Sequence, residues 1–163
     1  MMDEGKTFFR QIEDIEKKMA KLYEAFSRRF ANDSEASAFF YRMSSEEKSH
    51  ATQVQYQRRV LRQNPSIHIG TKADAQAVRD LSSRIDRINI EALSLEEALL
   101  LAIELEQSDA ERNLSGQEHP HLGKLMSSMA LQDKRHVEAL ETFAASRGVS
   151  LEGSRAAGSI GSP

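Results

Sequence analysis

Two pairs of side chains that can ligate a metal occupy matching positions in two separate helical patterns. Glu47 precedes His50 by three residues, and Asp133 precedes His136 by three residues. Residues i and i+3 lie on one face of an α-helix, so each pair can direct an oxygen and a nitrogen donor toward one point. The sequence therefore predicts that the two pairs contribute to one metal centre.

The apolar residues around the two pairs also match, position by position. The first run is Phe39, Phe40, Met43, Glu47, His50 and Val54, and the second is Leu125, Met126, Met129, Asp133, His136 and Leu140. In each run the carboxylate falls within the apolar stripe and not on the polar face. A single inward-facing acid is more often a core residue paired with Lys or Arg, so the repetition is what indicates a metal site.

Further acids fall on the inner faces of two other helical patterns. Glu16 lies within an apolar stripe that extends over residues 8–30, whereas its neighbour Glu13 is expected outside that stripe. In a later pattern, Glu106 and Asp109 fall on the inner face. The sequence therefore predicts two related helical hairpins. Each hairpin supplies one lone acid and one acid-plus-His pair.

Apolar residues at helical spacing predict four long helices. These helices cover about residues 5–30, 34–62, 95–115 and 122–146. Their ends are marked by residues that favour helix caps, namely Asn32, Asp33 and Ser34, the capping box of Ser94 with Glu97, and the glycines Gly116 and Gly148.

Residues 63–93 form a connection that is too long for a tight turn, while the other two connections are short. A long second connection lets the third long helix start at the end where the second started, which is the crossover topology of ferritin-like bundles. Within the connection, a short amphipathic helix lying across the bundle is predicted by Val78, Leu81, Ile85 and Ile88. The predicted fold is all-α, a ferritin-like four-helix bundle with a long crossover between helices 2 and 3.

The composition fits one domain and excludes several classes of site. The chain has 163 residues, no cysteine and a formal net charge of -3. Thiolate metal sites and disulfides are excluded, and no basic stripe that would bind nucleic acid is present. No apolar run approaches the roughly 20 residues that cross a bilayer, and the N-terminus does not resemble a signal peptide. A cytoplasmic protein that binds neither nucleic acid nor membrane is expected.

The domain division follows the change in composition near the C-terminus. Residues 1–147 are expected to form the helical metal-binding domain, and residues 148–163, rich in Gly, Ser and Ala, a mobile tail. The short GSIG run in the tail weakly resembles the docking peptides of ferritin-like cargo that is held in protein shells. A plain disordered end is the simpler interpretation.

The inward-facing acids indicate which metals would bind. The predicted inner acids, Glu16, Glu47, Glu106 and Asp133, would bring about four negative charges into the interior, at several kcal/mol per unpaired ion. Two divalent cations would neutralise this charge. Oxygen ligands with two imidazoles and no sulfur favour iron or manganese with about six ligands over tetrahedral zinc. Di-iron bundle proteins use this ligand set.

At these residues the chain resembles the rubrerythrin family of the ferritin-like superfamily. The resemblance covers residues 5–147 and depends on four stretches. These are EKKMAKLY with Glu16, EEKSHA with Glu47 and His50, AIELEQSD with Glu106, and QDKRHVEAL with Asp133 and His136. It implies a non-haem centre of two iron ions, with manganese as the alternative metal. Glu47 and Asp133 would bridge or chelate, Glu16 and Glu106 would be terminal ligands, and each histidine would cap one iron.

The resemblance also implies roles for two residues near this ligand set. Asp109 occupies the position of an additional family acid that one iron exchanges for a histidine when the redox state changes. Asp109 and Asp133 are each one methylene shorter than the Glu usual in the family. Tyr23, one or two turns after Glu16, is a candidate catalytic residue that could hydrogen-bond a ligand or supply an electron, although a packing role is the simpler interpretation.

Three functions follow from these expectations. The first is an enzyme of rubrerythrin type that reduces hydrogen peroxide or dioxygen. It would need an external electron donor, rubredoxin-like or a flavoprotein, because the cysteine-rich module of full-length rubrerythrins is absent. The second is a ferroxidase that loads iron into a store, and the third is a metal-sensing or metal-free helical module. A homodimer is expected in each case.

Overall fold

The computed structural model describes residues 4–63, 72–115 and 123–152, and all regular structure within these ranges is helical. The described elements are α1 (Glu4–Arg29), α2 (Ser34–Arg62), α3 (Lys72–Asp86), the 3-10 helix η1 (Ile90–Ala92), α4 (Leu95–Ser115) and α5 (Gly123–Ser146). The four long helices and the short helix in the second connection are those that the sequence predicts. Residues 153–163, the larger part of the predicted tail, and the predicted cap Gly116 lie outside the described residues.

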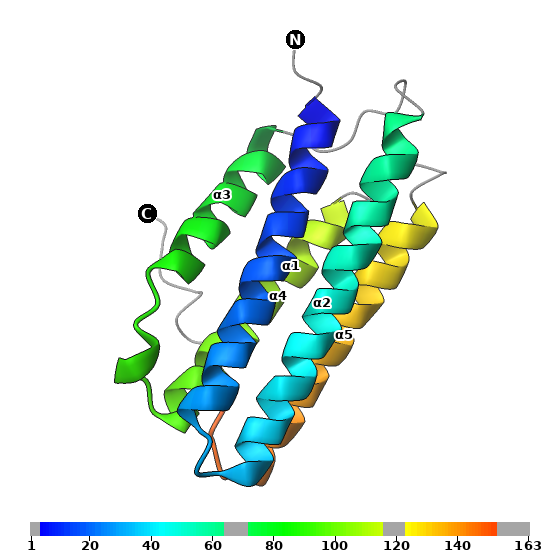
Figure 1. Cartoon of the computed structure of the whole chain (residues 1–163). Coiled ribbons are helices and arrows are strands. Elements are labelled where there is room, and N and C mark those ends of the chain that lie inside the picture. Colours follow the sequence, from blue (N-terminus) through cyan, green and yellow to red (C-terminus); the bar gives the residue numbers. More distant parts are fainter. Residues whose placement is uncertain (1–3, 64–71, 116–122, 153–163) are drawn as a thin grey trace, which may run out of the picture.

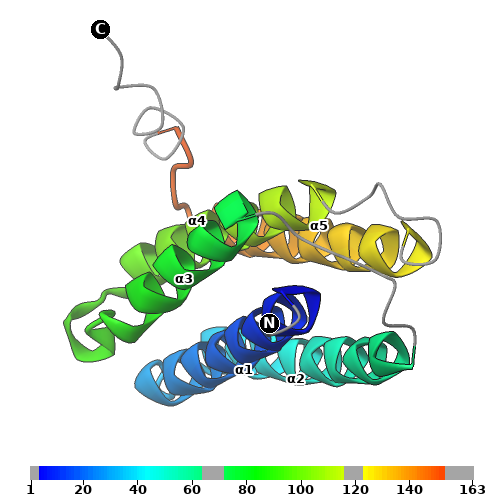
Figure 2. The same ribbon diagram turned by 90° about the horizontal axis from the view of Figure 1, so that it is seen from above.

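Two helical hairpins make up the bundle. α1 packs along α2 and α4 packs along α5, and Figure 2 shows these two pairs as facing layers. The amphipathic helix α3 contacts both α1 and α4, and it runs alongside α1 instead of crossing the bundle as expected (Figure 1). Lys18 of α1 fixes the position of α3: its Nζ donates a hydrogen bond to Ser82 Oγ at 2.8 Å and pairs with Asp86, both in α3.

Ion pairs at one end of the bundle define the direction of the second hairpin. Arg29, at the end of α1, pairs with Glu91 just before α4, and Arg147, just after α5, pairs with Asp33 in the turn before α2. The start of α4 and the end of α5 therefore lie at the end where α2 begins (Figure 1). The predicted crossover direction of the long connection is confirmed.

The local signals for the helix ends are also confirmed. Asp33 Oδ1 accepts a hydrogen bond from the backbone N–H of Ala36, and Ser94 and Glu97 each accept one from the other's backbone N–H. Gly148 has φ 73°, and the next N–H, of Val149, donates to the Ala144 carbonyl. This is the left-handed glycine that ends a helix in a Schellman motif.

An aromatic cluster fills the bundle near the α1–α2 turn. Tyr23, Phe26 and Phe40 are each 0% exposed, and the Phe26 and Phe40 ring centroids are 5.1 Å apart. Phe39 of α2 stacks on Phe143 of α5 with ring centroids 4.3 Å apart, which joins the two hairpins. Each buried ring contributes about 1.5–3 kcal/mol of transfer free energy, so this cluster fixes the spacing of the helices that flank the centre of the bundle.

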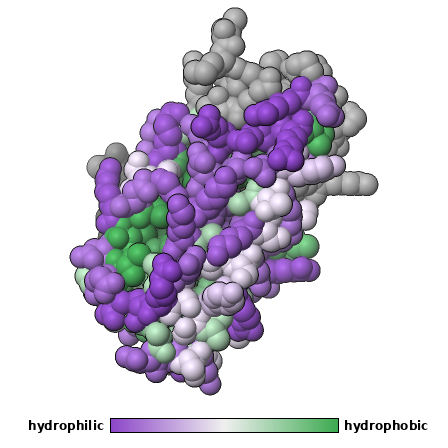
Figure 3. Space-filling model, in the orientation of Figure 1, coloured by the Kyte–Doolittle hydropathy of each residue, from purple (hydrophilic) through white to green (hydrophobic). Residues whose placement is uncertain are grey.

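One face of the bundle is mainly polar. In Figure 3 hydrophilic side chains cover most of the face in view, and the hydrophobic area near the lower end of α3 is small. The large hydrophobic side chains exposed among the described residues are Tyr41, Tyr56 and Leu131. Within the described ranges, no helix has both the length and the hydropathy that a bilayer span requires.

Candidate metal centre

Six of the predicted site residues lie in the middle of the bundle, and all four long helices contribute. Each is at most 5% exposed: Glu16 from α1, Glu47 and His50 from α2, Glu106 from α4, and Asp133 and His136 from α5. The helical spacing thus predicted their burial correctly. The side chain of Asp109 lies outside the described residues, so its role as an exchangeable ligand stays a prediction.

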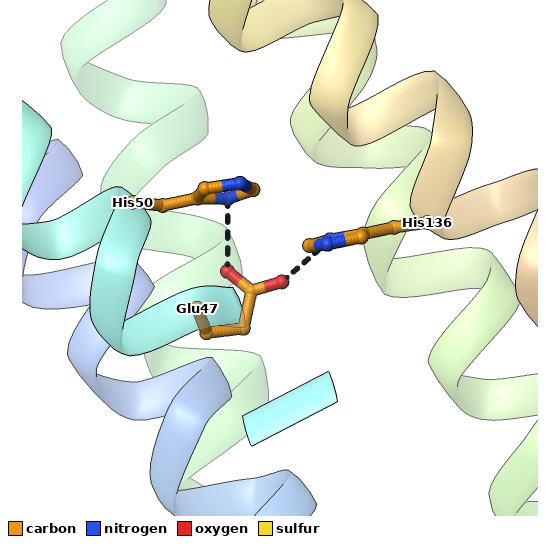
Figure 4. A group of neighbouring side chains, drawn as sticks. All are labelled: Glu47, His50 and His136. Carbon is orange, nitrogen blue, oxygen red and sulfur yellow. Dashed lines mark ion pairs between the residues drawn. The ribbon is translucent and has the colours of Figure 1, made fainter. Parts of the chain in front are cut away.

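Glu47 lies between the two histidines. Its Oε1 is 2.7 Å from Nδ1 of His136, and its Oε2 is 3.5 Å from Nδ1 of His50 (Figure 4). The two imidazole rings, from different hairpins, have centroids 4.8 Å apart and planes inclined by 19°. Both oxygens of one carboxylate therefore face imidazole nitrogens, which is the arrangement that a bridging carboxylate would need.

Each histidine also faces the lone acid of its own hairpin. His50 Nδ1 is 3.6 Å from Glu16 Oε2, and His136 Nδ1 is 3.6 Å from Glu106 Oε2. The centre therefore has two similar halves, one formed by Glu16 and His50 and the other by Glu106 and His136. Glu47 contacts both halves.

Several polar atoms of this cluster are buried without a hydrogen bond. Among the described residues, none hydrogen-bonds to either side-chain oxygen of Glu16, to Oε1 of Glu47 or to Nδ1 of His136. The short contact between the Glu47 and His136 atoms lacks the alignment that a hydrogen bond requires. A buried polar atom without a partner costs about 1–3 kcal/mol, so several in one place indicate a ligand that accepts their lone pairs.

The geometry fits a metal ion as that ligand. Ligand atoms of Glu47, His50 and His136 all lie within 4.8 Å of one another, and the three side chains are buried. This group could hold a metal ion. Carboxylate oxygens with imidazole nitrogens suit iron, manganese or zinc.

Burial and mutual repulsion change the proton affinity of the carboxylates. Burial, followed by the charge of Glu47, raises the pKa of Glu16 from 4.5 to about 7. Burial deprives the ionised carboxylate of water, and the charge of Glu47 repels it; together these effects outweigh the opposing influence of His50, which lowers the pKa. Without a cation, the centre therefore tends to retain a proton on Glu16 near neutral pH.

The pKa values of the two histidines are raised, although burial alone would lower them. Burial lowers the pKa of an imidazole, but the neighbouring acids outweigh it. Glu16 and Glu47 raise the pKa of His50 to about 10, and Glu106 and Glu47 raise that of His136 to about 11. Without a metal, both rings carry protons at neutral pH and neutralise part of the carboxylate charge.

Tyr23, in α1 of the first hairpin, contacts an acid of the second hairpin. Its hydroxyl donates a hydrogen bond of 2.5 Å to Glu106 Oε1, and the side chain is fully buried. Burial, and then the charge of Glu106, raises the pKa of the phenol well above its ordinary value, so the phenol stays neutral and acts as a donor. The sequence placed Tyr23 near Glu16, whereas the structure shows that the acid it holds is Glu106.

The sequence did not predict the positions of two further acids. Glu46, whose side chain is 58% exposed, has Oε2 2.8 Å from Nε2 of His136, a contact between α2 and α5 that no spacing within one helix could predict. Glu13 was expected outside the apolar stripe, and this was wrong because its residue is only 2% exposed. It pairs with Arg58 at 2.9 Å and with Lys17 at 2.5 Å. The close α1–α2 contact buries Glu13, and the basic side chains supply its counter-charge.

A buried cluster of acids and histidines in an all-helical bundle is thus the main candidate for a functional site in the described residues. Comparison of the chain with known protein families, curated proteins and solved structures gave no match. The function is therefore inferred from the geometry of the cluster and from the residues that surround it.

Proposed function

We propose that this chain is a non-haem di-iron protein of rubrerythrin type with a ferritin-like fold. It reduces hydrogen peroxide, or dioxygen, with electrons from an external donor. The main support is the position of Glu47, whose two oxygens face imidazole nitrogens from opposite hairpins. A single structural ion pair would need one such contact, whereas a dinuclear centre needs both. Manganese is the alternative metal.

The ligand assignment follows the two halves of the centre. Glu16 and His50 would hold one ion, and Glu106 and His136 would hold the other. Glu47 would bridge the two ions. Asp133, which is 1% exposed and lies three residues before His136 on α5, would complete the set as the second bridging or chelating acid. Asp109 remains the proposed acid that one ion exchanges for a histidine.

The protein's own residues position the ligands and keep water from the centre. A ferrous pair, when bound, would supply the two electrons that convert hydrogen peroxide and two protons into two water molecules. Tyr23 fixes one oxygen of Glu106, so that the other oxygen is free to ligate. Apolar neighbours such as Met19 and Leu99, at most 1% exposed, lower the local dielectric and strengthen each charge interaction.

The protonated, metal-free state offers a structural alternative. Histidinium rings between carboxylates could form a polar core that stabilises the bundle and binds nothing. That arrangement would favour aligned N–H···O hydrogen bonds, whereas the His136 Nδ1 contact with Glu47 is short and unaligned. The geometry therefore favours lone pairs that point toward a shared cation.

Stopped-flow mixing with hydrogen peroxide tests the proposed reaction. The ferrous protein, prepared without air, is expected to oxidise within the first mixing phase and at least ten times faster than free ferrous ion at the same concentration, since a positioned pair removes the encounter of separate ions. The increase of the carboxylate-to-iron charge-transfer absorption in the ultraviolet would report the oxidation. A rate equal to that of free ferrous ion would reject peroxide reduction.

The same preparation separates the enzyme from an iron store. Oxidation that stops at two irons per chain, and resumes only after an external reductant is added, supports the enzyme. Continued uptake of many irons per chain would favour storage and count against the proposal.

A further inference from the structure

The two halves of the centre differ in what lies behind their histidines. Glu46 Oε2 accepts a hydrogen bond from His136 Nε2 at 2.8 Å when that nitrogen carries the ring proton. The contacts of His50 with the acids of the centre are made through Nδ1, to Glu16 and Glu47. The His136 half therefore has an outer carboxylate, and it is also the half that Tyr23 holds through Glu106.

The sequence repeat shows how this difference arises. Glu46 directly precedes the Glu47–His50 pair, and the residue in the same place before the Asp133–His136 pair is Gln132. By the two-fold relation of the hairpins, Gln132 is the counterpart of Glu46 and is neutral. Its Oε1 is buried without a hydrogen-bond partner among the described side chains.

We propose that Glu46 is a positioning residue that holds His136 with its Nδ1 lone pair toward the centre, and that the half formed by Glu106 and His136 consequently binds its metal ion more tightly than the half formed by Glu16 and His50. This inference rests on the proposed dinuclear centre. It adds an order of loading, with the His136 half filled first.

The physical reason lies in the two nitrogens of one imidazole. A carboxylate that accepts the proton of Nε2 fixes the tautomer in which Nδ1 has a free lone pair, restrains the ring, and increases the electron density of the ligating nitrogen. The loss of such an outer partner typically weakens metal binding by about 10–100-fold. A neutral amide can still accept the hydrogen bond, but it lacks the charge that increases the basicity of the ring.

Titration of the metal-free protein with Co2+ under nitrogen tests the proposal, because the visible absorption of Co2+ reports each binding step separately. The unmodified protein is expected to bind two ions in two resolved steps. Glu46→Gln should weaken the tighter step by about 10–100-fold and leave the weaker step and the total of two ions unchanged. The control is Glu35→Gln, at an exposed acid of α2 that pairs with Arg147: it removes the same charge away from the centre and should leave both steps unaltered.

The reciprocal substitution gives an independent measurement. Gln132→Glu places a carboxylate at the matching position behind the His50 half and should tighten the weaker step, so that the two steps approach each other. Circular dichroism of each metal-free variant confirms that the helices are intact. If Glu46→Gln fails to fold, the Gln132→Glu titration still decides the matter.

The outcomes separate this inference from the function on which it rests. Two equal steps in the unmodified protein, unchanged steps in Glu46→Gln, or no effect of Gln132→Glu would each overturn the role of Glu46 while leaving the dinuclear centre intact. An unmodified protein that binds no Co2+ would overturn both proposals. A selective loss of the tighter step in Glu46→Gln supports the inference, since a merely structural surface contact would not affect one step alone.

Discussion

Replacement of both Glu47 and Glu106 with Gln is expected to abolish tight metal binding. Glu47 contacts both histidines, and Glu106 faces His136 at 3.6 Å, so the two substitutions remove the shared acid and one terminal acid. Gln preserves the size of each side chain, but its neutral oxygen is a weak ligand for a divalent cation. Equilibrium dialysis against Fe2+ or Mn2+ under nitrogen, followed by elemental analysis, would measure the loss.

A matched control keeps the number of substitutions and the change in charge constant. Glu96 and Glu138 lie on α4 and α5 and are exposed. The Glu96→Gln, Glu138→Gln protein should therefore bind as much metal as the unmodified chain. Undiminished metal content in the Glu47→Gln, Glu106→Gln protein would show that the buried cluster is not the binding site.

Metal binding is also expected to raise the thermal midpoint by about 10–20 °C. A ligand at 100 times its dissociation constant stabilises the folded state by about 2.7 kcal/mol per site, and a chain of this size gains about 2–4 °C per kcal/mol. Two occupied sites contribute twice the free energy of one. Differential scanning calorimetry with and without Mn2+ would measure the shift, and the Glu47→Gln, Glu106→Gln protein should show none.

The rise in thermal midpoint on metal binding should become larger as the pH increases from about 6 to 8. The pKa values of His50 and His136 are raised to about 10 and 11, and that of Glu16 to about 7, so a metal ion must displace protons from these groups. Competition from protons weakens as the pH rises, which increases metal affinity.

The stability of the metal-free protein decreases as the pH rises. This decrease enlarges the difference in thermal midpoint between the metal-bound and the metal-free protein. A group whose pKa is raised on folding stabilises the native state fully below its unfolded pKa, and this contribution is lost as the pH rises through the folded value. For Glu16 the loss occurs between about 4.5 and 7, and for the histidines it begins near 6.5. A midpoint shift that shrinks from pH 6 to pH 8 would contradict binding at these residues.

The helical elements could be predicted from the sequence because their signals are local. The reciprocal hydrogen bonds of Ser94 and Glu97, the cap at Asp33 and the left-handed Gly148 each depend on residues within one turn. The burial of the Glu47–His50 and Asp133–His136 pairs could be predicted for the same reason, since each pair shares a helix face with apolar neighbours. Helical periodicity assigns inner and outer faces before any packing is known.

Contacts between helices could not be predicted in this way. Glu46 lies beside the apolar stripe of its own helix, and only the placement of α5 brings His136 to it. Tyr23 was placed along the helix near Glu16, yet its hydroxyl crosses to Glu106 on α4. The error at Glu13 has the same cause, because the close approach of α2 extends the buried face of α1 beyond the apolar stripe and supplies Arg58 as a partner.

Elemental analysis of the protein purified without air tests the central claim most directly. The geometry of Glu47 between His50 and His136 predicts close to two iron ions, or two manganese ions, per chain, and their loss from the Glu47→Gln, Glu106→Gln variant. Protein that contains no transition metal, and that takes up none from Fe2+ or Mn2+ added under nitrogen, would contradict a metal centre in this bundle.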